Sequence, residues 1–289
     1  MIRRLVPQIL IRLSRGLRER TVGHGQDRPW VRALELSQRT DPIMDTPQTP
    51  AQTTVIVPTY NEKENIEALV TQLLGLSLDP RIIVVDDNSA DGTGAVADRL
   101  AQQYDGRVTV IHRPGKLGLG TAYIAGFQRA LDEGARLICT MDADFSHNPC
   151  YVPDLVTGID RGYDLVIGSR YAPGGGTSGC TISRKLLSWG ANAFARAALG
   201  LRVRDATAGF RCYRRSVLES VGIDAIEADG YSFLIEMLYR VSRQGWRVSE
   251  TPILFANRSQ GVSKISQDEI VKAIWTVIRL AATRRGPAG

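Results

Sequence analysis

The sequence has no long hydrophobic run: no stretch of 18 or more residues is uninterrupted by polar side chains. A bilayer-spanning helix needs about 20 apolar residues, so we expect no transmembrane helix. The apolar residues near the start are broken by Arg12 and Arg15, which argues against a secretory signal. The chain is therefore predicted to be soluble or peripheral to a membrane.

Histidine and cysteine are also scarce. The chain has 3 histidines and 4 cysteines, and Cys139, Cys150, Cys180 and Cys212 have no paired short spacing. This excludes the common zinc and dithiol motifs and favours reduced thiols in the cytosol. None of the histidines (His24, His112, His147) stands in a setting typical of a catalytic triad. Chemistry that needs a histidine base is therefore not expected.

Positive charge is concentrated at the start of the chain. Residues 1–43 hold 9 arginines against 4 acidic residues, so the remaining 246 residues carry only one of the 6 formal positive charges. A nucleic-acid-binding protein needs a basic face on its folded body. We therefore expect no nucleic-acid partner.

Residues 1–52 are predicted to form a basic extension and a Pro-rich linker. The first 20 residues have the spacing of a basic amphipathic helix, which would suit an anionic membrane surface, but Pro7 interrupts it. Two interpretations stay open: a membrane tether, or an extension that is either disordered or misannotated, the latter with Met44 as the true start.

From Thr54 onward, apolar runs alternate with helical periods, the pattern of β-α-β units and a mostly parallel sheet. Strands are predicted at 54–58, 81–87, 108–112, 136–144 and 163–170. A helix is predicted over 61–76 with Asn61 as its N-cap, and others over 92–104 and up to Glu133. Residues 267–289 are expected to form an amphipathic helix that either caps the core or enters the bilayer interface.

Acidic residues follow three of the predicted strands. They are Glu62, the pair Asp86 and Asp87, and the pair Asp142 and Asp144. On a strand, Asp142 and Asp144 would point to the same side, about 6 to 7 Å apart, so a cation should offset their repulsion. Oxygen ligands favour Mg²⁺ or Mn²⁺. Basic residues in nearby loops fit a phosphorylated substrate: Lys116, Arg170, Arg184, Arg258 and Lys264.

The motifs of residues 53–266 resemble those of family 2 glycosyltransferases with the GT-A fold. They are "VIVPTYNEKENI", "VVDDNSADGT", "GKLGLGTAY", "MDADFSHNP", "VIGSRY", "DATAGFRCYRR", "DGYSFLIEML" and "SQGVSKI". The set is most similar to dolichyl- or polyprenyl-phosphate mannose synthases. The resemblance implies a Rossmann-like, mixed but mostly parallel sheet flanked by helices, with residues 53–266 as the catalytic domain.

The resemblance also implies roles for individual residues. The nucleotide-sugar pocket would comprise Pro58, Tyr60, Glu62, Val85, Asp87, Asp142, Ala143, Arg258 and Lys264. Val85 and Asp87 would contact base and ribose, while Arg258 and Lys264 would belong to a loop that closes over the diphosphate. Asp144 would hold the metal, with Ser146 beside it. Arg170 and Arg184 would bind the acceptor phosphate, and with Asp144 they are the predicted catalytic residues.

The implied reaction is inverting transfer of mannose from GDP-mannose to a polyprenyl or dolichyl monophosphate at the cytoplasmic face of a membrane. A membrane partner protein is a further possibility. The alternatives are UDP-glucose as donor, or another acceptor. The "QxxRW" motif of processive synthases is missing, which argues against chain elongation. A dinucleotide-binding oxidoreductase is disfavoured because "GKLGLG" does not follow the first strand.

Overall fold

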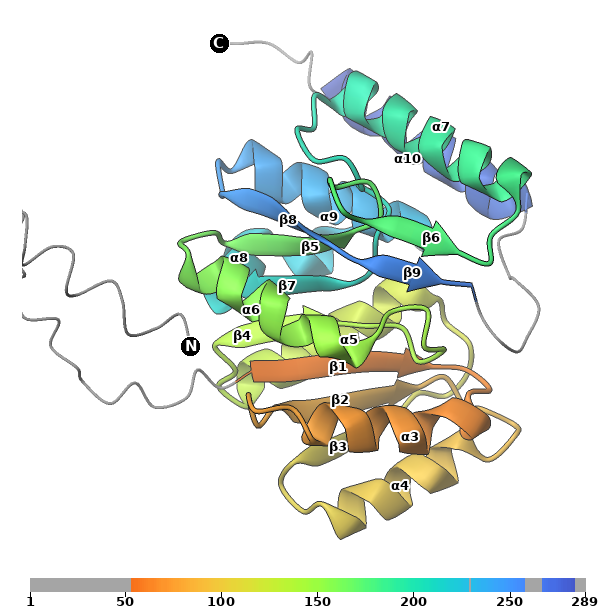
Figure 1. Ribbon diagram of the computed structural model, residues 1–289, viewed down its shortest axis with the longest axis vertical. Helices are drawn as coiled ribbons and strands as arrows, with labels where there is room; N and C mark the ends of the chain where they lie inside the picture. The colour runs from red at the N-terminus through yellow and green to blue at the C-terminus, as the bar shows by residue number, and fades with distance from the viewer. Residues whose placement is uncertain (1–52, 229, 258–266, 284–289) are drawn as a thin grey trace, which may run out of the picture. The chain divides into compact units, whose positions relative to one another are not determined.

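A computed structural model describes residues 53–228, 230–257 and 267–283. Its main sheet has seven strands in the order β3-β2-β1-β4-β7-β5-β8 (Figure 1). All pairings are parallel except those of β7 with β4 and β5, which are antiparallel. The strands are β1 (Thr53–Thr59), β2 (Arg81–Asp86), β3 (Val108–His112), β4 (Leu137–Thr140), β5 (Leu165–Ser169), β7 (Arg211–Arg214) and β8 (Val248–Pro252).

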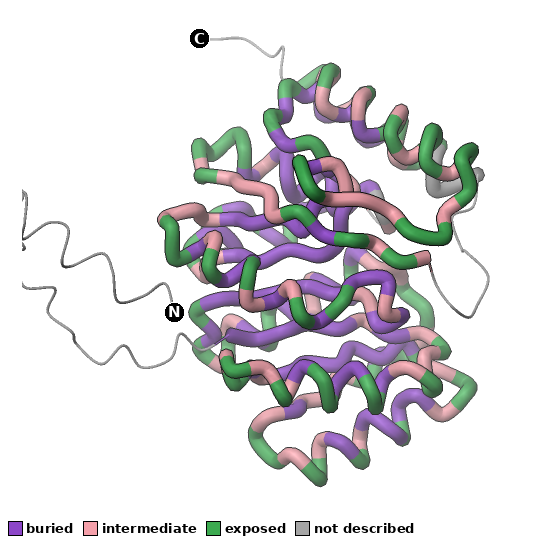
Figure 2. Tube along the Cα trace, in the orientation of Figure 1, coloured by how far each residue is buried: buried purple, intermediate pink, exposed green. Residues whose placement is uncertain are grey.

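Helices cover both faces of this sheet, because successive residues of its central strands are buried on opposite sides. Val55 and Val57 of β1 pack with helices α3, α4 and α6, whereas Ile56 packs with α5, α8 and α9. The bounds are α3 (Lys63–Leu74), α4 (Thr93–Gln103), α5 (Leu119–Asp132), α6 (Val152–Asp160), α8 (Arg215–Ser220) and α9 (Tyr231–Arg243). Figure 2 shows the central strands β1, β2, β4, β5 and β7 as the most continuously buried part of the described chain.

A second, smaller sheet is formed by the segments that follow β5 and β8 along the chain. The strands β6 (Gly176–Ser178) and β9 (Leu254–Ala256) form a two-stranded parallel sheet. Helix α7 (Ile182–Leu199) begins after Thr181, whose hydroxyl accepts from the Arg184 N–H, and ends at the left-handed Gly200. Helix α10 (Gln267–Thr283) packs against α7 and α9 (Figure 1). Two short 3₁₀ helices span Pro149–Tyr151 and Ile223–Ala225.

Two local predictions were wrong. Helix α3 begins at Lys63 with Glu62 as its N-cap, and Asn61 instead has a positive φ of 57° in the preceding turn. Strand β4 ends at Thr140, so Asp142 and Asp144 lie in the loop after it rather than on the strand. The proposed domain bounds at 52/53 and 266/267 stay predictions. Within the described residues, none of the helices combines the length and the hydrophobicity needed to span a bilayer.

Candidate active site

The last residue of β1 and the loop after β2 are tied together by a buried carboxylate. Asp86 is only 2% exposed and accepts hydrogen bonds from the hydroxyls of Thr59 (3.0 Å) and Ser89 (2.6 Å). The Glu62 N–H donates to the Thr93 hydroxyl at 2.9 Å, which joins the start of α3 to the start of α4. Asp86 therefore shapes this edge of the sheet, at the carboxyl ends of the strands where open α/β folds bind ligands.

Asp87, the next residue, is paired with a buried arginine. Arg113 Nη1 lies 2.7 Å from Asp87 Oδ1. The same guanidinium donates to the Gly118 carbonyl (3.2 Å) and to the Thr121 hydroxyl. Burial raises the pKa of Asp87, and the charge of Arg113 opposes that rise. Arg113 thus links the predicted base-and-ribose residue to the Gly-rich loop. Arg113 was not among the predicted site residues, although its place directly after a strand and before "PGKLGLG" was a usable signal.

The Gly-rich loop reaches the other wall of the predicted nucleotide pocket. Lys116 Nζ lies 4.6 Å from the centre of the Tyr60 ring, in cation–π contact. Pro58, Tyr60 and Glu62 are all partly exposed. Val85 is fully buried in the core, and its carbonyl accepts a long bond from the Thr59 hydroxyl at 3.4 Å.

The "DADFSH" loop brings four polar side chains together. Asp144 is buried and its Oδ1 accepts from the Ser146 N–H at 3.0 Å. The side chain of Asp142 is 30% exposed, and its Oδ2 lies 3.8 Å from His147 Nδ1. His147 stacks on Phe210, and burial lowers its pKa despite the opposing charge of Asp142. The imidazole of His147, packed between Phe210 and Phe255, therefore supports the loop.

The oxygen atoms of this loop can hold a divalent cation only if a substrate supplies further ligands. No group of three or more His, Cys, Asp or Glu side chains among the described residues forms a complete metal site. Two carboxylates in one loop are the type of partial oxygen shell that Mg²⁺ or Mn²⁺ completes with substrate phosphates. Asp142 and Asp144 therefore fit such an ion, together with a diphosphate, while Ser146 contacts Asp144 through its backbone N–H.

A cavity of about 460 Å³ extends from this loop towards α7 and α10. Asp142 and His147 line one part of it, and Arg170, Arg184 and Lys185 are also at its walls. Most of the remaining lining is apolar, contributed by Leu186, Leu187, Phe194, Phe255, Ile274 and Val277. Arg184 Nη1 donates to Asn257 Oδ1 at 2.8 Å. The cavity thus joins cationic side chains, a carboxylate and a long apolar wall.

The structure therefore brings most of the predicted site residues to one edge of the sheet. Asp142, Arg170 and Arg184 line a common cavity, while Asp87 lies in a separate buried pair. Ala143 is buried within the acidic loop. Arg258 and Lys264 lie outside the described residues, so their predicted role over the diphosphate stays a prediction.

Comparison with solved structures confirms the fold. Glucosyl-3-phosphoglycerate synthase from Mycobacterium tuberculosis, in complex with Mn²⁺, UDP and glucosyl-3-phosphoglycerate, aligns with a TM-score of 0.56 and 20% identity. The alignment covers 91% of this chain and 87% of that one. A second structure of that enzyme, with Mn²⁺, UDP-glucose and phosphoglyceric acid, gives a TM-score of 0.59 at 21% identity and covers 80% of each chain. The fold is the GT-A fold of glycosyltransferases.

Sequence comparison then defines the family. The model described as "Glycosyl transferase family 2" matches residues 54–222, and the chain belongs to this family. Polyprenol monophosphomannose synthase of Mycolicibacterium smegmatis is 42% identical over 259 residues, which cover 90% of this chain and 92% of that protein. Undecaprenyl-phosphate mannosyltransferase of Micrococcus luteus is 43% identical over 230 residues, covering 80% and 94%.

Proposed function

We propose that the protein transfers mannose from GDP-mannose to a polyprenyl or dolichyl monophosphate, with inversion at the sugar and with Mg²⁺ or Mn²⁺. The observation that carries this proposal is the cavity, which combines Asp142, Arg170 and Arg184 with apolar walls. A phosphate attached to a hydrocarbon chain has the same division between charged and apolar parts. The names of the two relatives support the same acceptor and sugar.

The donor would lie across the ends of β1, β2 and β4. Asp87, oriented by Arg113, would contact the base and ribose, and Tyr60 and Glu62 would border the nucleotide. Asp144, with Asp142 and Ser146 nearby, would hold the divalent ion against the diphosphate. Such an ion supplies charge neutralisation for the departing nucleoside diphosphate. The carboxylates thus define where the leaving group sits.

The acceptor phosphate would be its own nucleophile. Its second pKa is near 6, so it is largely dianionic at neutral pH and needs no protein base. An acceptor oxygen would form a bond to the anomeric carbon as the bond from that carbon to the diphosphate oxygen breaks, and the electron pair would leave with the nucleotide. Arg170 and Arg184 would hold the acceptor against its repulsion from the donor. This role accounts for two arginines beside Asp142 in one cavity.

An exposed apolar surface supports contact with the membrane that contains the acceptor. We call it the apolar face: Ile182, Leu186 and Trp189 of α7 with Val271, Trp275 and Ile278 of α10, each at least 50% exposed. Both triplets have the i, i+4, i+7 spacing of one helix side. The predicted amphipathic helix over 267–289 included Trp275 and Ile278, but Val271 and the α7 part were not predicted. We infer peripheral binding at the cytoplasmic leaflet, with the cavity opening beside the lipid.

The decisive experiment is product analysis with purified protein. Radiolabelled GDP-mannose or UDP-glucose is incubated with a short polyprenyl phosphate, Mn²⁺ and detergent, and the label in an organic extract is counted. We expect lipid-soluble label from GDP-mannose. Lipid-soluble label from UDP-glucose alone would identify the alternative donor, and water-soluble product alone would reject a lipid acceptor.

Matched variants connect the product to the site. Arg184→Ala should lose most acceptor use while it keeps nucleotide binding, because Arg184 lines the cavity. Arg202→Ala, an exposed arginine outside the cavity, is the control for loss of positive charge. Equal effects of the two substitutions would count against the assignment of Arg184.

A further inference from the structure

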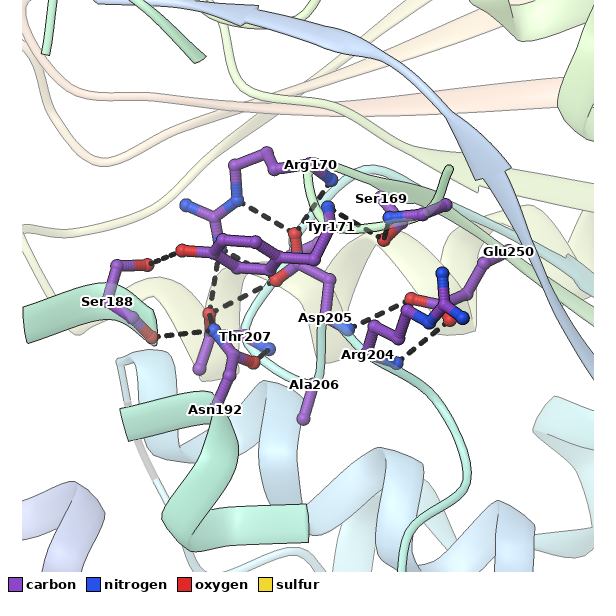
Figure 3. Close-up of polar contacts among 12 residues, drawn as sticks. Ser169, Arg170, Tyr171, Ser188, Asn192, Arg204, Asp205, Ala206, Thr207 and Glu250 are labelled. Atoms are coloured by element: carbon purple, nitrogen blue, oxygen red, sulfur yellow. Dashed lines mark hydrogen bonds and ion pairs between the residues drawn. The ribbon is translucent and has the colours of Figure 1, made fainter. Parts of the chain in front are cut away.

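A fully buried carboxylate lies behind Arg170. Asp205 is 0% exposed and does not line the cavity. Its Oδ2 accepts from the backbone N–H (3.0 Å) and the Nε–H (2.8 Å) of Arg170, and its Oδ1 accepts from Nη2 at 2.7 Å. Figure 3 shows this fork-to-fork contact. Asp205 therefore fixes the plane of the guanidinium and also the backbone from which the side chain extends.

Asp205 is itself held in place by a second carboxylate. Glu250 of β8 accepts from the backbone N–H groups of Arg204 (2.8 Å) and Asp205 (2.9 Å) (Figure 3). These bonds attach the loop between α7 and β7 to the edge strand of the main sheet. The position of Asp205 is thus set by the sheet rather than by a mobile surface loop.

The same loop also holds helix α7, which carries Arg184. The Thr207 hydroxyl accepts from Arg170 Nη2 (2.9 Å) and from Asn192 Nδ2 (3.1 Å). Asn192 Oδ1 accepts from the Thr207 N–H at 3.3 Å. The Tyr171 hydroxyl donates to Ser188 Oγ at 2.8 Å. Ser188 and Asn192, one helical turn apart, therefore lie on the side of α7 that faces this network. Arg184 lies one turn before Ser188 on the same side of the helix.

We propose that Asp205 is a positioning residue for the acceptor phosphate: it orients Arg170 at the cavity, and through the Thr207 loop it keeps Arg170 in register with Arg184. This inference rests on the proposed function. The competing explanation is that the buried pair only stabilises the fold. Two well-packed apolar residues can stabilise a fold as well as a buried ion pair does. Only a carboxylate such as that of Asp205 also holds the guanidinium of Arg170 in one orientation at the cavity wall. The two explanations differ in which kinetic constant responds.

The test is Asp205→Asn, assayed with a short polyprenyl phosphate and GDP-mannose. The amide keeps the shape but loses the charge and one acceptor of the fork. We expect the KM for the prenyl phosphate to rise roughly ten- to a hundredfold, which corresponds to the loss of one hydrogen bond to a charged group. The KM for GDP-mannose and the slow hydrolysis of donor without acceptor should change less than about twofold.

Asp164→Asn is the matched control, because Asp164 precedes the same strand, β5, at its opposite end. Asp164 pairs with Arg214 (3.3 Å) and accepts from the Arg247 N–H, away from the cavity. This variant should leave the KM for the acceptor unchanged. If Asp205→Asn does not fold, Asp205→Glu keeps the charge but moves the carboxylate by one methylene, and it should also raise the acceptor KM selectively.

The outcomes separate this inference from the proposed function. A wild-type protein that forms no lipid-linked mannose would reject the proposed function itself. An active wild type whose Asp205 variants have a normal acceptor KM, or raise both KM values equally, would overturn the positioning role alone. An Asp164→Asn variant with the same selective defect would also overturn it.

Discussion

The buried pair between Arg113 and Asp87 allows a quantitative prediction. Their side chains are only 7% and 9% exposed. The substitution Arg113→Met keeps an unbranched side chain but leaves the Asp87 carboxylate without its charged partner. Removing one member of a buried ion pair costs about 3 to 5 kcal/mol. For a domain of this size, that loss should lower Tm by about 6 to 20 °C.

The loss of stability caused by Arg113→Met should be larger at high pH than at low pH. Burial already raises the pKa of Asp87 from its ordinary value of 3.8, and Arg113 is the main opposing influence. Without Arg113 the folded-state pKa rises further. When the pKa of a carboxyl is higher in the folded state than in the unfolded state, the folded state is favoured at a pH below the unfolded-state pKa. That advantage is lost as the pH increases through the folded-state pKa. The variant should therefore be destabilised less at pH 5 than at pH 8.

Urea unfolding of wild type and variant at both pH values measures this difference. Thr121→Val is the control, because it removes one hydrogen-bond partner of Arg113 and leaves the ion pair intact. It should cost about 0.5 to 1.5 kcal/mol, equally at both pH values. A loss in Arg113→Met that is below about 1 kcal/mol, or the same at pH 5 and pH 8, would refute the reasoning.

Three further predictions test packing, the apolar face and the metal. Gly126→Ala should destabilise by about 1 to 3 kcal/mol in thermal unfolding, since its Cβ would lie 2.5 Å from Ile56; Gly190→Ala, with nothing within 4 Å, should be neutral or stabilising. Replacing Trp189 and Trp275 by Ser should weaken sedimentation with anionic vesicles while activity on a detergent-dispersed acceptor persists; unchanged sedimentation would contradict the membrane role. Chelation by EDTA should weaken GDP-mannose binding in calorimetry, and Mn²⁺ should restore it; equal affinity with and without metal would be the contrary result.

The sheet was predictable where hydrophobic runs are unambiguous. Strands β1, β2, β3 and β5 lie within or close to the predicted ranges, because β-branched residues on both faces are typical of buried parallel strands. The antiparallel strand β7 was not predicted. Its "RCYR" sequence carries Arg211, which is fully buried and donates to the carbonyls of Ala206, Ala208 and Leu234. A charged residue that is buried because backbone carbonyls pair with it gives no strand signal in the sequence.

The site was predictable for the side chains that belong to local motifs, but not for their partners. Asp87, Asp142 and Arg170 follow apolar runs and could be found along the chain. Asp87 pairs with Arg113, 26 residues away, and Arg170 pairs with Asp205, 35 residues away. The place of Arg113 directly after a strand was a local signal, but nothing in the sequence indicates which residue pairs with which. The α7 part of the apolar face was also not predicted, because only the structure shows which side of α7 is left exposed by the other described residues.

The two arginines of the cavity differ in what they offer to an anion. Arg170 is paired with the buried Asp205, so the pair has little net charge and contributes mainly fixed geometry. Arg184 instead contacts the neutral amide of Asn257, and Lys185 is its neighbour at the same wall. In the proposed function, the positive charge that would attract the acceptor phosphate therefore comes mainly from Arg184 and Lys185 at the start of α7. Because α7 also carries half of the apolar face, one helix presents both the charge for the acceptor's phosphate and the surface for its hydrocarbon surroundings.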